Sequence, residues 1–148
     1  MAIFRRILVP SDFTETSDRA LDWAIDLAAA VGAPVTVIHS YEIPILGFPD
    51  ASMLPTPDIS RKIAEAAKKG LDALVDARRA RGVALDAILR EGVAWEQINA
   101  VAEDVNADLI VIGTHGRKGI ARALLGSVAE NVIRTSRRPV LTIHGPRD

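Results

Sequence analysis

The sequence contains no cysteine, which excludes disulfide bonds, thiolate nucleophiles and zinc sites built from cysteine. This absence is compatible with a reducing compartment, and we expect a cytoplasmic protein. Long apolar runs are also lacking, because none approaches the roughly 20 residues of a membrane-spanning helix. Arg5 and Arg6 interrupt the first apolar segment, which is too short for a signal peptide. We therefore expect no membrane partner.

An excess of charge of one sign is missing as well. The chain carries 18 Lys and Arg against 19 Asp and Glu, a net charge of −1. Broad electrostatic attraction to nucleic acid is therefore not expected, and a specific small ligand is the favoured partner. With 148 residues, of which 49% are hydrophobic, the chain suits one compact domain spanning residues 1–148.

Apolar, β-branched runs alternate with helical patterns along the chain. The runs predict strands at residues 3–9, 34–40, 83–89, 107–112 and 139–143. Between the first two, Leu21, Ala24 and Ala28 share one face of a helix that Gly32 ends. Since the strands are nearly continuous in apolar character, helices should cover both faces of a parallel sheet. The pattern predicts an α/β fold with a doubly wound, five-stranded parallel sheet.

Residues 41–58 break this rhythm, because they have no periodicity and contain four prolines. A long loop is predicted here, leaving the carboxyl end of the second strand, where open α/β sheets bind ligands. The segment is either a lid over a site or an ordinary insertion. Trp23 and Trp95 lie on helical patterns, and we interpret both as packing residues.

Asp12 follows the first strand and precedes the first helix. Its spacing to Glu15 is that of a capping box, so Asp12 could simply cap the helix. The functional interpretation is that Asp12 accepts hydrogen bonds from a ribose hydroxyl, as acidic residues do in dinucleotide-binding folds. Residue type alone favours the cap.

A glycine-rich segment, GTHGRKGIARALLGS, links the fourth strand to the last helix. Glycines 113, 116 and 126 suit positive φ and a close approach to a ligand, and a helix N-terminus offers N–H groups to an anion. The glycines could also be mere turn residues, but their combination with Ser127 favours phosphate binding. The nearby basic side chains are explained equally well by a solvated loop.

The spacing of two, then nine residues between these glycines resembles the nucleotide-binding signature of the universal stress protein family, in its ATP-binding branch. The resemblance extends over the whole chain, through ILVPSDFTETSDRALDWAIDLA, VTVIHSY, ADLIVIGTHGRKG and LLGSVAENVIRTSRRPVLTI. It implies a Rossmann-like sheet, similar to that of the adenine nucleotide alpha hydrolases, with strand order 3-2-1-4-5. ATP would lie across the carboxyl ends of the strands.

The resemblance also assigns roles to residues. Asp12 would bind ribose beside Pro10, and Ile38 and His39 would border adenine through their backbone. The phosphates would be held near Gly113, His115 and Gly116 and, further out, by three residues at the start of the last helix: Gly126, Ser127 and Val128. The bound nucleotide could be ATP, ADP or AMP, with Mg²⁺ accompanying it. The three histidines lack metal-ligand spacing, so no protein metal site is expected.

The family commonly forms homodimers through the last strand, here Val140–Ile143, which would also cover a sheet edge. The implied function is that of a cytoplasmic, dimeric ATP-binding module in stress response. The alternative is a slow ATPase or autokinase using the same site, which would need a base or water-positioning residue. The only candidates for such a base are His115 and Asp12, so efficient catalysis is not expected.

Two other classes of α/β protein need residues that this chain lacks. A receiver domain needs an aspartate after the third strand and a lysine after the fifth, where this chain has Leu89-Arg90-Glu91 and Ile143-His144-Gly145. An ATP-pyrophosphatase needs a glycine-rich loop after the first strand, where Pro10-Ser11-Asp12-Phe13 has no glycine. Both are excluded. A flavin or adenylate carrier remains open, since a groove alone does not specify its nucleotide.

Overall fold

The computed structural model describes residues 3–44, 55–115 and 125–146. These residues form a five-stranded sheet in the order β3-β2-β1-β4-β5, with every neighbouring pair parallel, so the predicted fold class and strand order are confirmed. The strands are β1 (Ile7–Pro10), β2 (Val35–Tyr41), β3 (Leu85–Glu91), β4 (Leu109–Gly113) and β5 (Val140–Ile143).

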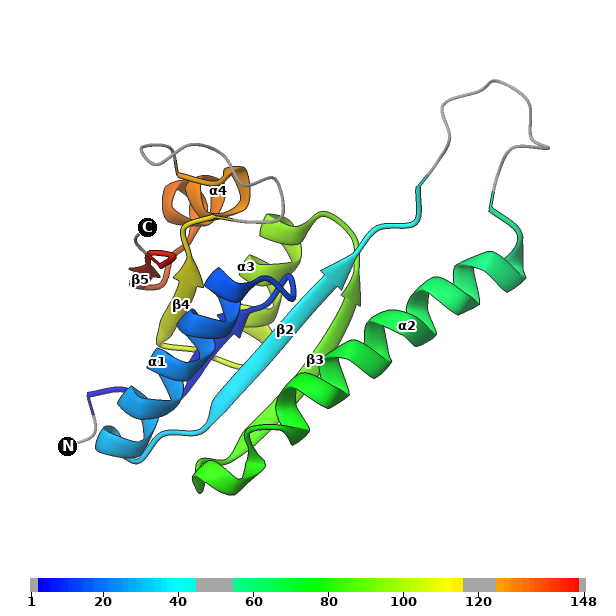
Figure 1. Ribbon diagram of the computed structural model, residues 1–148. Helices are drawn as coiled ribbons and strands as arrows, with labels where there is room; N and C mark the ends of the chain where they lie inside the picture. The colour runs from blue at the N-terminus through cyan, green and yellow to red at the C-terminus, as the bar shows by residue number, and fades with distance from the viewer. Residues whose placement is uncertain (1–2, 45–54, 116–124, 147–148) are drawn as a thin grey trace.

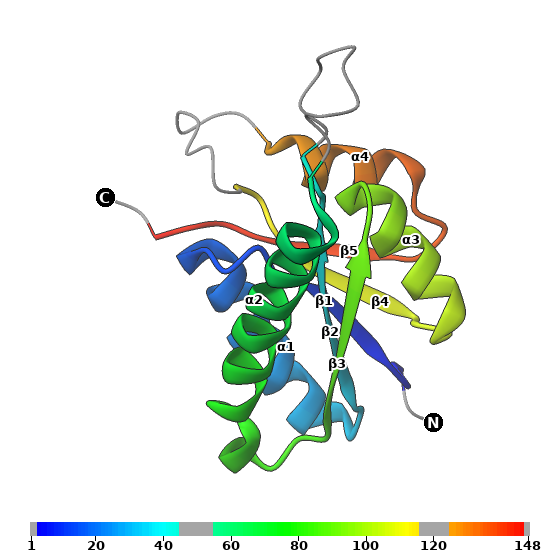
Figure 2. The same cartoon turned by 90° about the vertical axis from the view of Figure 1, so that its right-hand side faces the viewer.

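Helices cover both faces of the sheet (Figures 1 and 2). They are α1 (Glu15–Val31), α2 (Pro57–Asp76), α3 (Ala94–Asp104) and α4 (Ser127–Thr135), with a short 3-10 helix, η2 (Arg79–Arg81). α1 and α2 pack on one face, and α3 and α4 on the other. None of the helices in the described residues is long and apolar enough to cross a membrane.

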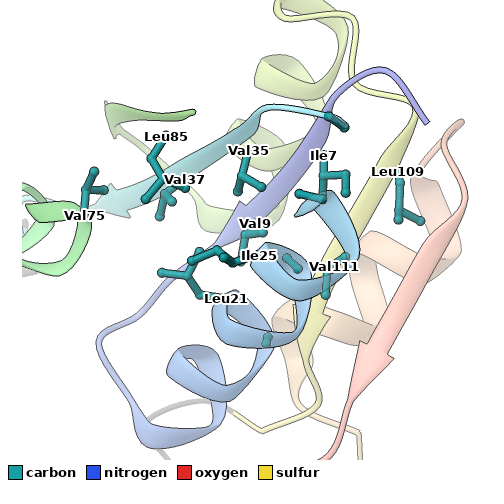
Figure 3. Packing of buried hydrophobic residues seen from close by; sticks show 14 of the residues in the cluster. Ile7, Val9, Leu21, Ile25, Val35, Val37, Val75, Leu85, Leu109 and Val111 are labelled. Carbon is teal, nitrogen blue, oxygen red and sulfur yellow. The ribbon is translucent and has the colours of Figure 1, made fainter. Parts of the chain in front are cut away.

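Successive side chains of each strand point to opposite faces of the sheet and so contribute to two separate hydrophobic cores. Ile7 and Val9 lie on the sheet face that α1 covers (Figure 3), whereas Leu8 between them joins the core under α3 and α4. β4 alternates in the same way, with Val111 in the first core and Ile110 in the second. All five side chains are fully buried. The central strands are therefore apolar on both faces, as the sequence predicted.

Local signals set the ends of α1. Thr14 is the N-cap, and its hydroxyl accepts a hydrogen bond from the backbone N–H of Ser17 at 3.3 Å. Gly32 ends the helix with φ of 73°, a left-handed conformation that glycine adopts without strain. The predicted Gly32 end is confirmed, but the N-cap is Thr14 and not Asp12.

The bounds of two segments differ from the sequence-based expectations. β1 begins at Ile7 instead of residue 3, because the N–H groups of Arg5 and Arg6 donate to the carboxylate of Asp108 and not to a neighbouring strand. The predicted loop at 41–58 is shorter, since β2 extends to Tyr41 and α2 begins at Pro57. The lid interpretation falls on residues 45–54, outside the described residues.

The prediction that Trp23 is a packing residue is wrong. Its side chain is 58% exposed. The physical reason is its angle on the helix, because Trp23 lies about 200° around α1 from the buried Leu21, given about 100° per residue. Trp95 does pack against the core under α3 and α4, as predicted.

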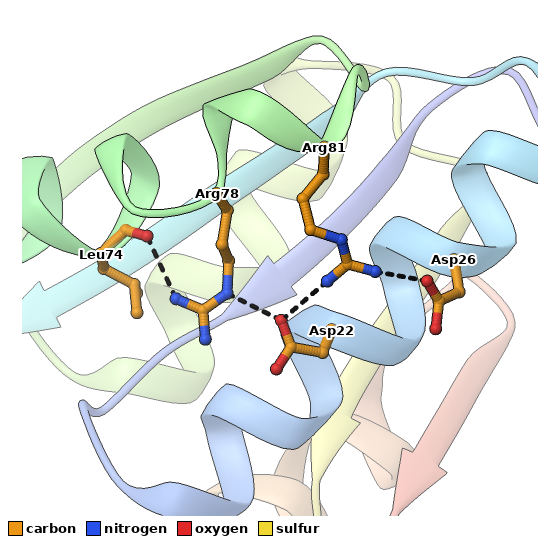
Figure 4. Close-up of polar contacts among 5 residues, drawn as sticks. All are labelled: Asp22, Asp26, Leu74, Arg78 and Arg81. Atoms are coloured by element: carbon orange, nitrogen blue, oxygen red, sulfur yellow. Dashed lines mark hydrogen bonds and ion pairs between the residues drawn. The ribbon is translucent and has the colours of Figure 1, made fainter.

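Ion pairs join the middle of α1 to the segment that follows α2, residues 78–81, which includes η2 (Figure 4). Arg78 Nε donates to Asp22 Oδ1 at 2.8 Å, and the same oxygen accepts from Arg81 at 3.1 Å. Arg81 also pairs with Asp26. Arg78 is the best buried of these side chains, at 14% exposed, and it donates a further bond to the carbonyl of Leu74. These bonds hold the segment after α2 against α1.

Asp18 lies one turn before this cluster and is less well accommodated. Its Oδ1 is buried and has no hydrogen-bond partner among the described residues. Burial raises the pKa of Asp18 above 3.8, and the carboxylates of Asp22, Asp12 and Glu15 add to the effect, while Arg78 opposes it. The ionised form of Asp18 therefore costs stability in the folded state.

We expect Asp18→Asn to stabilise the protein at neutral pH. The folded pKa exceeds the unfolded value of 3.8, so the cost is fully present above the folded pKa and disappears as pH falls toward 3.8. Urea unfolding at pH 7 should show a higher free energy of unfolding for the variant, with the gain reduced by solvent screening. The gain should vanish below pH 3.8.

A matched control is Asp58→Asn, which changes a carboxylate in the first turn of α2 that is 82% exposed and paired with Arg61. That variant should lose a few tenths of a kcal/mol at neutral pH. A loss of stability in Asp18→Asn at pH 7 would contradict the account, because attraction to Arg78 and to the helix dipole would then outweigh burial.

Candidate functional site

A cavity of about 450 Å³ opens at the carboxyl ends of the strands. Its floor comes from the ends of β1, β2 and β4, and its walls from α3 and the start of α4. The polar lining residues gather at three places: the β1–α1 turn with the first turn of α1, the end of β2, and the residues after β4 with the start of α4. They are Ser11, Asp12, Ser17, Ser40, Glu42, Thr114, His115 and Ser127. The apolar and glycine lining completes it: Pro10, Ile38, Ala94, Ile98, Ile112, Gly113, Gly126, Val128 and Ala129.

Most of the predicted site residues are brought together here. The cavity is lined by eight of them: Pro10, Asp12, Ile38, Gly113, His115, Gly126, Ser127 and Val128. His39 is not among the lining residues, and Gly116 lies outside the described residues. The segments concerned are far apart in the sequence and meet only because parallel strands place their carboxyl ends at one edge.

Asp12 is held by the turn that follows β1. Its Oδ1 accepts bonds from the backbone N–H of Thr14 at 3.1 Å and from the Thr14 hydroxyl at 2.5 Å. Thr14 is the N-cap of α1, so Asp12 stabilises the N-cap residue but does not itself cap the helix. Between them Phe13 adopts φ of 63°, a left-handed conformation that reverses the chain. The carboxylate is thereby fixed at the cavity wall.

The end of β2 divides its side chains between two faces. Ile38, Ser40 and Glu42 line the cavity, and His39 points to the opposite face. The His39 ring stacks on Phe13, with centroids 4.1 Å apart. Its Nδ1 lies 2.7 Å from the carbonyl oxygen of Ser11 and donates to it, since a carbonyl can only accept. His39 thus supports the turn that carries Asp12.

The chain leaves β4 under close constraint. Thr114 N–H donates to the carbonyl of Ile143 at 3.0 Å, and Gly126 N–H donates to the carbonyl of Thr114 at 2.6 Å. The two ends of the glycine-rich segment are thereby joined beside β5. The orientation of α4 is therefore tied to the edge of the sheet.

The expectation of positive φ is wrong for the two glycines of this segment that the structure describes. Gly126 has φ of −60°, and Gly113 is not among the positive-φ residues. Gly113 lacks a side chain for another reason, since a Cβ there would lie 2.9 Å from Thr16 Cγ2 and 3.2 Å from the Thr16 backbone. The close approach is between β4 and α1.

The first backbone N–H groups of α4 have no acceptor within the helix. Its N-cap, Gly126, has no side chain to accept from them, and the first intrahelical bond is donated by Glu130. The N–H groups of Ser127, Val128 and Ala129 precede that bond, and all three residues line the cavity. This end of the helix also carries the positive end of the dipole, so the wall suits an anion.

The sequence model of the universal stress protein family matches residues 3–144. The chain belongs to this family. A relative is the universal stress protein MJ0531 of Methanocaldococcus jannaschii, which is 34% identical over 98% of this chain and 85% of the relative. The resemblance found in the sequence motifs is confirmed.

Solved structures agree with this membership. MJ0577 of the same organism superposes with a TM-score of 0.84 at 28% identity, covering 99% of both chains. A universal stress protein in complex with cAMP gives a TM-score of 0.71 at 28% identity, covering 99% of this chain and all of the other. One from Archaeoglobus fulgidus in complex with dAMP gives 0.64 at 27% identity, with 97% and 99% covered.

Sequence reasoning missed several lining residues of this family member. Ser40 and Glu42 could have been found from Ile38, because strand alternation places every second residue on the same face. Thr114 lies between two predicted residues, and its buried side chain gave no sequence signal. Ala94 and Ile98 come from α3, which packs beside the cavity through tertiary contacts alone.

Proposed function

We propose that the cavity binds an adenine nucleotide and that the protein acts as a nucleotide-binding module of the stress response. ATP is the proposed ligand, with ADP or AMP as occupants of the same site. The observation that carries the proposal is the uncapped N-terminus of α4 in the wall of a cavity at the carboxyl edge of the sheet. A volume of about 450 Å³ lies within the roughly 300–1,000 Å³ range of small-molecule sites.

The phosphate end of the ligand would lie against α4. Three consecutive N–H groups from Ser127 to Ala129 have no acceptor within the helix, and phosphate oxygens only accept. The Ser127 hydroxyl adds a donor at the same point. Gly113, His115 and Gly116 are proposed to line the path of the inner phosphates.

The nucleoside end would lie across β1 and β2. Asp12, oriented by Thr14, is proposed to accept from a ribose hydroxyl, with Pro10 beside it. Adenine would lie at Ile38, whose apolar side chain lines the cavity where β2 ends. The related structures in complex with cAMP and dAMP support an adenine nucleotide as the class of ligand.

Mg²⁺ is proposed to arrive on the phosphates of ATP. Across residues 3–44, 55–115 and 125–146, no group of three or more His, Asp or Glu side chains could hold a metal ion. Phosphate oxygens and water would therefore coordinate Mg²⁺ in place of protein side chains, since Mg²⁺ commonly retains water and binds through phosphates. The cation would neutralise charge that Asp12 and Glu42 would otherwise repel.

We also propose that two chains pair through β5. Among the described residues this strand pairs with β4 alone and is the last strand of the sheet, so its other side is an edge. The carbonyls of Pro139 and Ile143 face β4, so by alternation the backbone groups of Val140 and Thr142 face outward. Exposed apolar side chains on α4 and β5 add surface that a partner would cover: Ile133 and Leu141.

The nucleotide proposal predicts a charge-specific effect at Val128. Val128→Glu places a carboxylate in the cavity beside the proposed phosphates, while Val128→Gln has nearly the same shape without the charge. Calorimetric titration should show ATP binding about tenfold weaker in the Glu variant than in the Gln variant. Adenosine should bind both variants about equally.

Neither variant should unfold and so lower the measured ATP affinity, because Val128 is 36% exposed and a carboxylate in the first helical turn is favourable. Equal ATP affinity in the two variants would show that the phosphates do not lie at α4. Binding of GTP as tightly as ATP would contradict the adenine assignment, and no nucleotide binding by the unaltered protein would contradict the function.

The dimer proposal predicts that Thr142→Pro gives a monomer. Proline removes the outward N–H that would pair with the partner and leaves the bonds to β4 in place, as edge strands tolerate. Thr142→Val keeps the N–H and should remain a dimer. Sedimentation equilibrium measures the mass, and circular dichroism checks that both variants fold. A monomeric unaltered protein, or a folded and dimeric Thr142→Pro, would contradict pairing through β5.

A further inference from the structure

Two histidines meet at one hydroxyl beside the cavity. The Thr114 side chain is buried, at 1% exposed, and its Oγ1 lies 3.0 Å from His115 Nδ1 and 3.4 Å from His144 Nδ1. His115 lines the cavity, whereas His144 directly follows β5 and is exposed. The hydroxyl therefore connects a residue of the candidate site to the edge of the sheet.

A hydroxyl carries one proton, so it can donate to only one of the two rings. The lengths alone do not set the direction of either bond, because 3.0 Å suits both an O–H···N and an N–H···O bond. We assign the hydroxyl proton to the shorter contact, to His115, so that Thr114 accepts from the Nδ1–H of His144 in the longer one. His115 accepts at Nδ1 in this arrangement. As a neutral imidazole it must then carry its proton on Nε2.

His115 Nε2 is buried and has no hydrogen-bond partner in the part of the chain that the structure describes. A buried N–H without an acceptor is costly, so this atom is the one left for a ligand oxygen. The opposite tautomer would present a lone pair there, which phosphate and ionised oxygens cannot satisfy. A nucleotide thus requires the tautomer that the Thr114 bond favours.

We propose that His144 is a positioning residue of the nucleotide site. Through the Thr114 hydroxyl it holds His115 in the tautomer protonated at Nε2, so that this N–H donates to an oxygen of the bound nucleotide. The inference rests on the proposed function for the identity of the ligand, but the tautomer itself is a property of the protein alone.

Four variants separate this role from a structural one. His144→Phe removes the donor to Thr114, and His144→Asn restores one, since the asparagine amide N–H can lie near the position of Nδ1. Thr114→Val removes the hydroxyl with little change of shape, and Thr114→Ser keeps it. Because His144 is exposed, its variants should leave the fold intact, and circular dichroism verifies the fold of all four.

The test is a long-range ¹H–¹⁵N spectrum of the full chain labelled at histidine, which identifies the protonated ring nitrogen without any nucleotide. His115 should be protonated at Nε2 in the unaltered protein, in His144→Asn and in Thr114→Ser. It should become a mixture of tautomers in His144→Phe and Thr114→Val. ATP affinity should fall about fivefold in the same two variants and recover in the other two.

The inference is overturned if His115 carries its proton on Nδ1, or if His144→Phe leaves the tautomer unchanged. A different outcome identifies failure of the proposed function. If the unaltered protein has the expected tautomer but binds no adenine nucleotide, the relay through Thr114 stands and the nucleotide is wrong as its ligand.

Discussion

Burial of the central strands on both faces is the constraint on which the rest of the structure depends. Ile7, Leu8 and Val9 in β1 are fully buried, as are Ile110 and Val111 in β4. With helices over both faces, the polar chemistry of the chain is confined to the ends of the strands. The carboxyl ends of β1, β2 and β4 meet at one edge, and the cavity lies there.

The backbone hydrogen bonds of Thr114 fix the start of α4 relative to the sheet. Its N–H is held by Ile143 of β5, and its carbonyl by Gly126 at the N-cap of α4. The unsatisfied donors of α4 therefore have a fixed direction relative to the sheet. Because β5 is also the open edge, the proposed ligand site and the proposed dimer surface share one set of bonds.

Much of this architecture could be predicted from the sequence, because it follows from periodic patterns. Apolar runs gave the strands, and the glycine spacing gave the family and with it the strand order. Two errors could have been avoided from the sequence by working out which face of its element each residue occupies. Trp23 lies opposite the buried face of α1, and Ser40 lies on the same face of β2 as Ile38. Both follow from helix and strand periods.

Other features depend on contacts that no local pattern encodes. Gly113 is required by its contact with Thr16 on α1, not by positive φ. Asp12 and Thr14 are both good N-cap residues, and only the turn geometry at Phe13 decides between them. The meeting of His115 and His144 at Thr114 depends on the pairing of β4 with β5.

The central claim is that the first backbone amides of α4 hold the phosphates of an adenine nucleotide. The most direct measurement is a ¹H–¹⁵N correlation spectrum of the whole protein recorded while ATP is added. The account predicts the largest shifts at the amides of Ser127, Val128 and Ala129, with Arg79–Arg81 at the far end of the sheet unchanged. Unshifted α4 amides at saturating ATP would contradict it.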